Sequence, residues 1–259
     1  MKFAFVLFSY IPYGGLQQDM LKILKVCQAR QVEVSIFCMQ WEGEKPENTE
    51  VIILPGQGYT KTAQREYFVE SMLSETVEKF DLVLGFNKMP GLDYYYAADY
   101  CFAEKAWNER SFFYRLTARS KQYLDFEEAV FGKDEEAVSL LLTPDQRQDF
   151  ITHYQTDEER LIVLPPGIKP DRRAGPDATV KRRHLRFQLS IADDEYLLLQ
   201  IGSSFKTKGL DRSLMAYAAL KENLRKKVHF YVIGEDKPDI YLKMAERLGV
   251  SKRFKILSG

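Results

Sequence analysis

The sequence of 259 residues contains few cysteines and no excess of charge of either sign. Its three cysteines are an odd number, and no two of them form a CxxC pair. We therefore expect neither a disulfide framework nor a thiolate zinc site, and this usage fits a reducing compartment. Lysine plus arginine and aspartate plus glutamate each number 37, which argues against extensive contact with nucleic acid.

Other signals are missing as well. The three histidines lack the spacing of metal ligands and no DxD motif follows a predicted strand, so we expect no metal ion and no cofactor. No apolar run approaches the ~20 residues that span a bilayer. Met1 leads directly into a predicted strand, so we expect no signal peptide. The GxGxxG fingerprint of a Rossmann dehydrogenase does not occur after a strand.

The sequence does contain a regular alternation of apolar strands and helices. Continuous apolar runs at residues 82–84 and 140–142 favour strands that are covered on both faces. The alternation predicts an α/β fold with a parallel sheet and right-handed crossovers. In the first half, strands are predicted at residues 2–8, 32–38, 51–54, 81–85, 138–142 and 161–164. Helices are predicted there at residues 15–30, 63–79, 93–107, 112–131 and 144–154.

A stretch rich in proline and glycine after Leu164 predicts a linker. We therefore predict two domains, residues 1–166 and 167–259. The second domain is shorter than the ~100 residues that a complete nucleotide-type domain needs, so we expect an incomplete domain and a chain cut from a longer one. A naturally small second domain is the alternative. Its predicted elements are a strand at 196–201, a helix at 209–225, a strand at 228–233, a helix at 238–248 and a strand at 254–257.

Two glycine-bearing loops, one in each half, carry the clearest functional signal. Gly14 and Gly15 follow the first strand, and residues 202–209, with Lys206 and Lys208, follow the first strand of the second half. Ligands of α/β sheets bind where such loops lie, beyond the carboxyl ends of the strands. Glycine lets a phosphate approach the backbone, and the next helix offers free N–H groups to an anion. A plain turn and solvated lysines are the alternatives.

Several segments match a known family in order along the chain. They are YIPYGGLQQD at 10–19, WEGEKP at 41–46, GFNKMPGLDYYYAADYCFAEK at 85–105, FFYRLTARSKQY at 112–123, HYQTDEERLIVLPPGIKPDRR at 153–173, LLLQIGSSFKTKGLDRS at 197–213 and VIGEDKP at 232–238. On these residues the chain resembles the retaining glycosyltransferases of the GT-B fold, and among them the bacterial lipopolysaccharide core glucosyltransferase I family. The segment at 85–105 is the most specific of them.

The resemblance implies two Rossmann-like domains that face a cleft. It implies transfer of glucose, with retention, from UDP-glucose to a heptose of the lipopolysaccharide inner core, without a metal. It also implies that members continue past Gly259 into a glutamate-pair motif at the donor, so the chain as given is expected to be weakly active or inactive. The donor contacts that it implies are Gly14, Gly15, Asp19, Arg172, Gly202, Lys206 and Lys208.

Cations near a departing diphosphate stabilise its charge, which is the role implied for Lys208 and Arg172. Asp19 is either a sugar contact or electrostatic stabiliser, as the resemblance implies, or a partner of the helix dipole. Asp99 is our candidate for the acceptor-side carboxylate, with Asp19 as competitor and a helix-surface role as alternative. In retaining transferases of this fold the leaving phosphate is thought to take the acceptor proton, so no protein nucleophile is required.

Residues 110–123 carry four cations, no acids and four aromatics. Such a mixture suits an anionic membrane surface, and peripheral attachment to the cytoplasmic face of the inner membrane fits a lipid-anchored acceptor. An acceptor-binding surface and an amphipathic helix with Phe113, Leu116 and Tyr123 packed inward are the alternatives. The residues of this predicted membrane or acceptor surface are Arg110, Phe112, Phe113, Arg115, Arg119 and Lys121.

Two other functions stay open. One is a transferase of the same fold that uses another sugar. The other is a non-catalytic module that binds a nucleotide sugar or a membrane, which an incomplete donor domain makes plausible.

Overall fold

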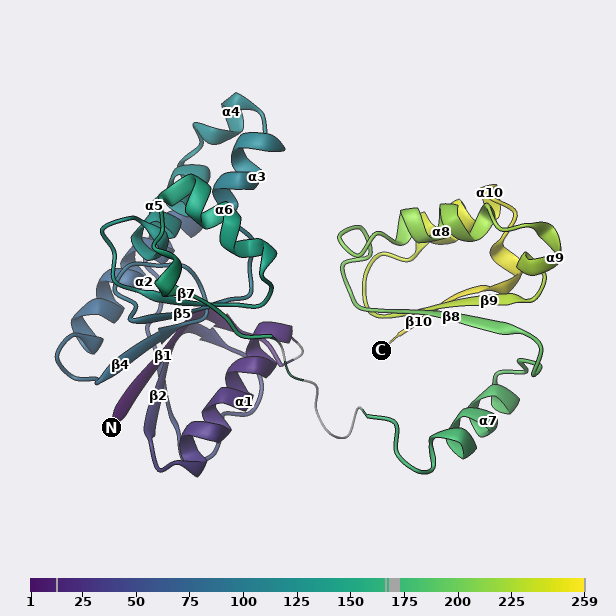
Figure 1. Ribbon diagram of the computed structural model, residues 1–259, viewed down its shortest axis with the longest axis horizontal. Helices are drawn as coiled ribbons and strands as arrows, with labels where there is room; N and C mark the ends of the chain where they lie inside the picture. The colour runs from purple at the N-terminus through teal and green to yellow at the C-terminus, as the bar shows by residue number, and fades with distance from the viewer. Residues whose placement is uncertain (13, 166, 168–172, 259) are drawn as a thin grey trace. The chain divides into compact units, whose positions relative to one another are not determined.

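The computed structural model describes residues 1–12, 14–165, 167 and 173–258 (Figure 1). The chain forms two compact units, residues 1–167 and 168–259, each with its own sheet. The predicted division after residue 166 lies one residue from this boundary.

Unit 1 contains a parallel sheet of seven strands in the order β3-β2-β1-β4-β5-β6-β7. The central strand β1 pairs with β2 on one side and with β4 on the other, so that Val6 lies beside both Phe37 and Gly85. The predicted parallel α/β fold is confirmed. The strands are β1 (Lys2–Tyr10), β2 (Glu33–Trp41), β3 (Glu50–Ile53), β4 (Leu82–Gly85), β5 (Tyr94–Ala97), β6 (Val138–Leu141) and β7 (Leu161–Val163).

Helices cover both faces of this sheet (Figure 1). On one face, Met20 and Leu24 of α1 pack against Phe5 of β1. On the other face, Phe68 of α2 and Phe131 of α5 belong to a second buried cluster. Two covered faces explain why the strands are apolar without alternation. The helices are α1 (Gly15–Ala29), α2 (Lys61–Thr76), α3 (Phe102–Asn108), α4 (Phe112–Arg115), α5 (Ala118–Phe131), α6 (Asp145–Tyr154) and the 3-10 turn η1 (Glu158–Arg160).

The predicted helix at 93–107 is wrong in its first half. Residues 94–97 form β5, which lies between β4 and β6, and only residues 102–108 form a helix, α3. Tyr95 is completely buried in the sheet, because its aromatic side chain fits a pleated surface between two covering layers. Asp99 therefore lies in a loop at the carboxyl end of a strand and not on a helix.

Two long predicted helices are each broken in two. The helix at 112–131 divides into α4 and α5, because Thr117 caps the start of α5 by accepting a hydrogen bond from the N–H of Ser120 (3.2 Å). The helix at 209–225 divides into α8 and α9 around residues 219–221.

Unit 2 contains a parallel sheet of three strands in the order β10-β9-β8. Helices α8 and α10 lie on one face of it and share a core with Val232 of β9 (Figure 1). Apolar side chains of β8 stay exposed, and Ile201 is 68% exposed. The elements are α7 (Ala178–Gln188), β8 (Tyr196–Ile201), α8 (Leu210–Ala218), α9 (Glu222–Arg225), β9 (Val228–Ile233), α10 (Asp239–Arg247), the 3-10 turn η3 (Ser251–Arg253) and β10 (Phe254–Leu257).

Across the described part of the chain, no helix combines the length and apolar character that crossing a bilayer requires.

Candidate active site

The strand order of unit 1 creates a switch point between β1 and β4. The chain leaves β1 toward β2 and leaves β4 toward β5, so the connections diverge there. Ligands of open α/β sheets bind in the crevice at such a point, beyond the carboxyl ends of the strands. The N–H of Phe8 on β1 donates a hydrogen bond to Oδ1 of Asn87, just after β4 (2.8 Å), which joins the two sides of the crevice.

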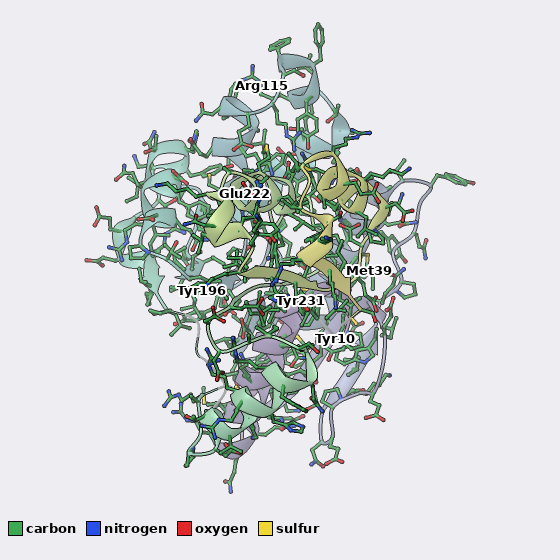
Figure 2. All side chains as sticks on the ribbon, turned by 90° about the vertical axis from the view of Figure 1, so that its right-hand side faces the viewer. Tyr10, Met39, Arg115, Tyr196, Glu222 and Tyr231 are labelled. Carbon is green, nitrogen blue, oxygen red and sulfur yellow. The ribbon has the colours of Figure 1, made fainter. Side chains whose placement is uncertain are left out.

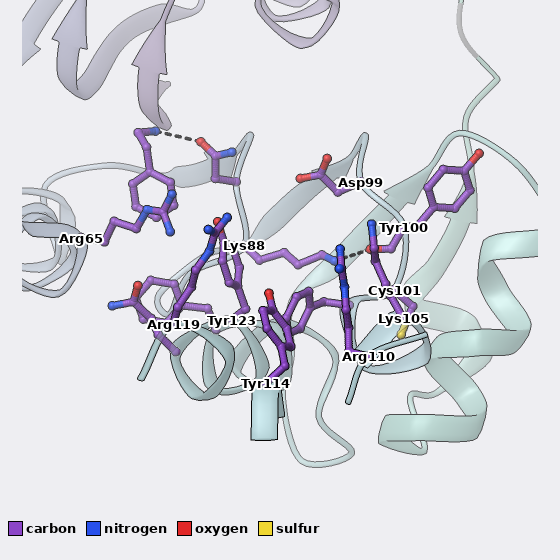
Figure 3. A pocket seen from close by; sticks show the side chains of 15 residues that line it. Arg65, Lys88, Asp99, Tyr100, Cys101, Lys105, Arg110, Tyr114, Arg119 and Tyr123 are labelled. Atoms are coloured by element: carbon purple, nitrogen blue, oxygen red, sulfur yellow. Dashed lines mark hydrogen bonds between the residues drawn. The ribbon is translucent and has the colours of Figure 1, made fainter. Parts of the chain in front are cut away.

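A cavity of about 400 Å³ opens at this edge of the sheet (Figure 3). Its walls come from the ends of β1, β4 and β5 and from helices α2, α3, α4 and α5. The residues that line it are Phe8, Arg65, Asn87, Lys88, Asp99, Tyr100, Cys101, Phe102, Lys105, Arg110, Tyr114, Arg119, Gln122, Tyr123 and Phe126. The predicted residues Asp99, Arg110 and Arg119 therefore meet in one place.

A buried ion pair holds the floor of this cavity. Glu127 of α5 is 0% exposed and pairs with Lys88, whose Nζ also donates to the carbonyl of Tyr100 (2.8 Å). Glu127 further accepts hydrogen bonds from the N–H groups of Phe102 (2.7 Å) and Ala103 (2.8 Å). One carboxylate thus fixes the loop after β4 and caps α3, since the first N–H groups of a helix lack partners of their own.

Two groups beside Glu127, the Tyr154 hydroxyl and the Cys101 thiol, stay neutral near pH 7. The hydroxyl of Tyr154 donates to Glu127 (2.8 Å), and burial followed by this carboxylate raises the tyrosine pKa. Burial, and then Glu127, raises the pKa of the Cys101 thiol from 9.0 to about 12. Cys101 is consequently a poor nucleophile, because the thiolate is the reactive form.

The two predicted carboxylates lie in different surroundings. Asp99 is exposed at the mouth of the cavity. Asp19 of α1 accepts a hydrogen bond from the hydroxyl of Tyr96 on β5 (3.0 Å) and pairs with Lys22 (2.6 Å). Burial and then this hydrogen bond raise the pKa of Tyr96. Asp19 does not line the cavity and serves as a link between α1 and the sheet.

Gly14 and Gly15 differ in what a side chain would meet. Gly14 is the N-cap of α1, and a Cβ there would overlap Oε1 of Gln17, whose Nε2 donates to the carbonyl of Ser9 (3.1 Å). A Cβ at Gly15 would meet nothing within 4 Å. The packing within unit 1 therefore gives a steric reason for the first glycine and none for the second.

The loop after β8 in unit 2 is hydrogen-bonded to the loop after β9. Asp236 accepts a hydrogen bond from the N–H of the buried Phe205 (2.7 Å), and the N–H of Glu235 donates to Oγ of Ser203 (3.1 Å). Gly202 (φ 139°) has a backbone conformation that favours glycine. These contacts fix the backbone from which the predicted lysines extend.

The two predicted lysines of this loop are not equivalent. Lys206 pairs with Asp211 at the start of α8 (3.0 Å). Lys208 is exposed, packs its aliphatic stem near Gly202 and has no carboxylate partner among the described residues. The uncompensated charge is therefore that of Lys208. Arg172 lies outside the described residues.

The predicted membrane or acceptor surface is divided by the structure. Arg110 and Arg119 line the cavity, whereas Phe112, Phe113, Arg115 and Lys121 do not. Phe113 is 80% exposed and Leu116 is also exposed, so the alternative of inward packing is wrong for these two residues. It holds for Tyr123, which is partly buried and packs against Phe102. The guanidinium of Arg115 lies over the ring of Trp107, 4.2 Å from its centroid, at the end of unit 1 that carries α4 (Figure 2).

Comparison with known proteins identifies the family. The sequence model of the glycosyl transferases group 1 matches residues 181–259. The lipopolysaccharide glucosyltransferase WaaG of Escherichia coli K12 is 42% identical over 259 residues, which cover 99% of this chain and 69% of that enzyme. The chain belongs to the WaaG family. The predicted resemblance to lipopolysaccharide glucosyltransferases is thereby confirmed.

Solved structures agree with this family. The crystal structure of WaaG, a glycosyltransferase involved in lipopolysaccharide biosynthesis, superposes with a TM-score of 0.88 and covers 99% of this chain and 70% of that one at 42% identity. An α,α-trehalose-phosphate synthase (UDP-forming) from Burkholderia vietnamiensis superposes with a TM-score of 0.63 at 12% identity, covering 99% and 72% of the two chains. The second likeness shows the fold alone.

Sequence reasoning missed several residues of the site in this WaaG relative. Lys88 and Glu127 are two of them, although a lysine three residues after the end of a strand is a recognisable signal. Arg65 lies in the middle of α2 and has no local pattern that marks it. In the described part of the chain, no group of three or more histidine, cysteine, aspartate or glutamate side chains is placed to hold a metal ion.

Proposed function

We propose that this protein transfers glucose from UDP-glucose to a heptose of the lipopolysaccharide inner core, with retention of configuration at the anomeric carbon. The observation that carries the proposal is the 42% identity to a lipopolysaccharide glucosyltransferase over 99% of the chain. A cavity at the switch point of unit 1 and a cationic loop at the corresponding edge of unit 2 support it. Unit 1 would take the acceptor and unit 2 the nucleotide sugar.

In the reaction, the bond between the anomeric carbon and the diphosphate oxygen breaks while an acceptor hydroxyl oxygen attacks the same face of the sugar. The proton of that hydroxyl passes to the departing phosphate oxygen. Negative charge grows on the diphosphate, and Lys208 is the cation best suited to stabilise it, because no carboxylate among the described residues neutralises it. Arg172 would add a bidentate phosphate contact, and Gly202 and Gly15 would let the donor approach the backbone.

Asp99 suits the acceptor side of this reaction. Its carboxylate is exposed at the cavity and can accept a hydrogen bond from the attacking hydroxyl, which orients the oxygen. Asp19 is the weaker candidate because Tyr96 and Lys22 already engage its carboxylate. We infer that no metal ion is required, since side-chain cations supply the neutralisation.

A transfer assay tests the proposal. The protein is used in excess over a lipid-free core oligosaccharide that ends in heptose, so that slow turnover still gives product. We expect label to pass from UDP-glucose and not from UDP-galactose or GDP-mannose, and we expect the new bond to have the α configuration by NMR. Transfer from another donor would identify a different sugar specificity. Binding of UDP-glucose by calorimetry without any transfer would favour a non-catalytic module.

The matched pair Lys208→Ala and Lys206→Ala tests the donor loop. We expect Lys208→Ala to weaken UDP binding about tenfold, the effect of losing one charge-assisted contact. Lys206→Ala should weaken binding much less, because Asp211 already neutralises this lysine. Equal UDP affinity in the wild type and Lys208→Ala would remove Lys208 from the donor site.

We further propose that the protein attaches to the cytoplasmic face of the inner membrane through an exposed patch around α4. Trp107, Phe112, Phe113 and Leu116 are all exposed there, and Arg115 lies over Trp107. Aromatic side chains next to cations suit the interface of an anionic bilayer.

Vesicle partitioning measures this attachment. Arg115→Gln combined with Phe113→Ser should reduce binding to vesicles that contain phosphatidylglycerol, with less effect on neutral vesicles. The matched control is Lys252→Gln, an exposed cation of unit 2. Unchanged partitioning of the double variant would exclude the patch.

A further inference from the structure

The cavity of unit 1 carries more positive charge than a neutral sugar needs. Five of its lining residues are cations, and Asp99 is the one carboxylate among the described residues that line it. Glu127, at the floor of the cavity, neutralises Lys88. The other four cations have no carboxylate partner in the described part of the chain, namely Arg65, Lys105, Arg110 and Arg119.

Two of the arginines are held against the same ring. The guanidinium of Arg65 lies between Phe8 and Tyr123, 5.2 Å and 5.1 Å from the two ring centroids. Arg119 also lies over Tyr123, at 5.6 Å from its centroid. On a neighbouring wall, Arg110 lies over Tyr114 at 5.3 Å (Figure 3).

This geometry leaves the hydrogen-bonding edges of the guanidiniums free. An arginine that stacks on an aromatic ring uses the face of its planar group, so its N–H donors remain for a bidentate contact. No described carboxylate or carbonyl takes those donors in Arg65, Arg110 or Arg119. A guanidinium restrained by stacking also loses less conformational freedom when it binds an anion. The cavity is therefore arranged for a carboxylate or phosphate.

We propose that this cavity recognises an acidic group, a carboxylate or phosphate carried by the acceptor glycan, and that Arg65 and Arg119 bind it. The proposal rests on the proposed function, because it assigns the acceptor to unit 1. The neutral heptose then lies beside this anion, near Asp99. The acceptor class is an anionic oligosaccharide, selected by charge next to the residue that reacts.

A phospholipid head group is the less suitable occupant. Arg65 is only partly exposed, and it lies between Phe8 and Tyr123 in a recess beyond the ends of the strands. The exposed apolar side chains that suit a bilayer, such as Phe113, lie outside the cavity lining. The structure thus separates the recess that holds Arg65 from the exposed apolar patch around Phe113.

Calorimetry without any donor tests the proposal independently of catalysis. The probes are a lipid-free, heptose-terminated core oligosaccharide, the same glycan after reduction of its carboxylates to alcohols, and the same glycan after phosphatase treatment. We expect the untreated glycan to bind at least tenfold more tightly than one of the two treated forms, and added salt to weaken that binding. The treated form that binds poorly reveals whether carboxylate or phosphate is recognised.

Variants locate the contact. Arg65→Gln and Arg119→Gln should each weaken binding of the untreated glycan about tenfold and leave the low affinity for the neutralised glycan unchanged. Arg65→Lys should recover part of the loss. Lys133→Gln is the matched control, since Lys133 is exposed just beyond the end of α5 and does not line the cavity. Circular dichroism checks that each variant is folded.

Three results would overturn the proposal. The first is equal affinity for the acidic and neutralised glycans, and the second is no binding of either. The third is a loss of vesicle binding in Arg65→Gln with unchanged glycan binding, which would assign the pair to a lipid head group. Intact glycan binding with no transfer from UDP-glucose would instead contradict only the proposed reaction.

Discussion

At the scale of single residues, the buried pair of Glu127 and Lys88 has the largest predicted effect on stability. Glu127→Gln leaves the Lys88 ammonium in a buried position without its counter-charge, and breaking such a pair costs about 3–5 kcal/mol. We expect the midpoint of urea unfolding to fall accordingly. Glu128→Gln, which changes the exposed neighbour in the same helix, is the control and should have almost no effect.

A second variant separates lost charge from lost packing. The combination Glu127→Leu with Lys88→Met removes both charges and should recover much of the stability that Glu127→Gln loses, because apolar pairs often replace buried ion pairs without cost. If the combined variant is less stable than Glu127→Gln, the hydrogen bonds to the N–H groups of α3 dominate instead.

Glu195 predicts an acid-sensitive contact in unit 2. The N–H of Ala192 donates to it (2.9 Å), and Arg253 (2.6 Å) and His229 (3.1 Å) bind the same carboxylate, so that its pKa falls from 4.5 to about 2. A folded-state pKa below the unfolded value stabilises the fold above pH 4.5, and this stabilisation disappears as the pH falls toward 2. Glu195→Gln should therefore flatten the fall of the melting temperature over this interval.

The control for this pH dependence is Glu246→Gln, which changes an exposed residue of α10. Its melting temperature should follow the wild-type curve. An identical acid profile in Glu195→Gln and wild type would mean that other carboxylates determine the acid unfolding of unit 2.

At the scale of elements, the turn from β1 to α1 separates a structural glycine from one that serves a ligand. Gly14→Ala would displace Gln17 from the carbonyl of Ser9 and should cost about 1 kcal/mol. Gly15→Ala meets open space and removes conformational freedom from the unfolded chain, so it should stabilise unit 1 by about 0.4–1 kcal/mol.

Gly14→Ala and Gly15→Ala are also compared for their affinity for UDP-glucose. If a phosphate approaches the backbone at Gly15, Gly15→Ala weakens UDP-glucose binding although the protein is more stable. Calorimetry and thermal unfolding on the same samples measure both quantities. A stabilised Gly15→Ala variant with wild-type affinity would show that Gly15 does not contact the donor.

Local sequence patterns predicted most strands of both sheets, because these strands are largely apolar runs. Local patterns failed at residues 93–107, where a loop of four residues separates the aromatic strand Tyr94–Ala97 from the helix that contains Glu104 and Ala106. The aromatic run is a strand because it packs between β4 and β6, and that pairing is a tertiary property.

The candidate site shows the same limit. Glycines and lysines after strands could be recognised from local spacing. The positions of Arg65 over Tyr123 and of Glu127 beside Lys88 depend on helices that meet only in the folded unit. Asp19 was recognised as an acid near a helix start, but its hydrogen bond to Tyr96 is a long-range contact that no spacing predicts.

At the scale of the whole molecule, separate cores predict that the two units unfold separately. The buried clusters of unit 1 contain no residue of unit 2, and the cluster around Phe230 contains none of unit 1. Both tryptophans, Trp41 and Trp107, belong to unit 1. Tryptophan fluorescence therefore reports the unfolding of unit 1, whereas far-ultraviolet circular dichroism reports helices and strands of both units.

We expect the two probes to give different urea transitions, because coincidence is the mark of a single cooperative unit. Glu127→Gln should shift the fluorescence transition, which reports unit 1. Glu195→Gln at pH 5 should shift the dichroism transition of unit 2 and leave the fluorescence transition unchanged. Unit 2 should unfold at the lower urea concentration, since it has three strands and leaves apolar side chains of β8 such as Ile201 exposed. Superimposable transitions that both variants shift together would contradict this independence and would show that the two cores unfold as one.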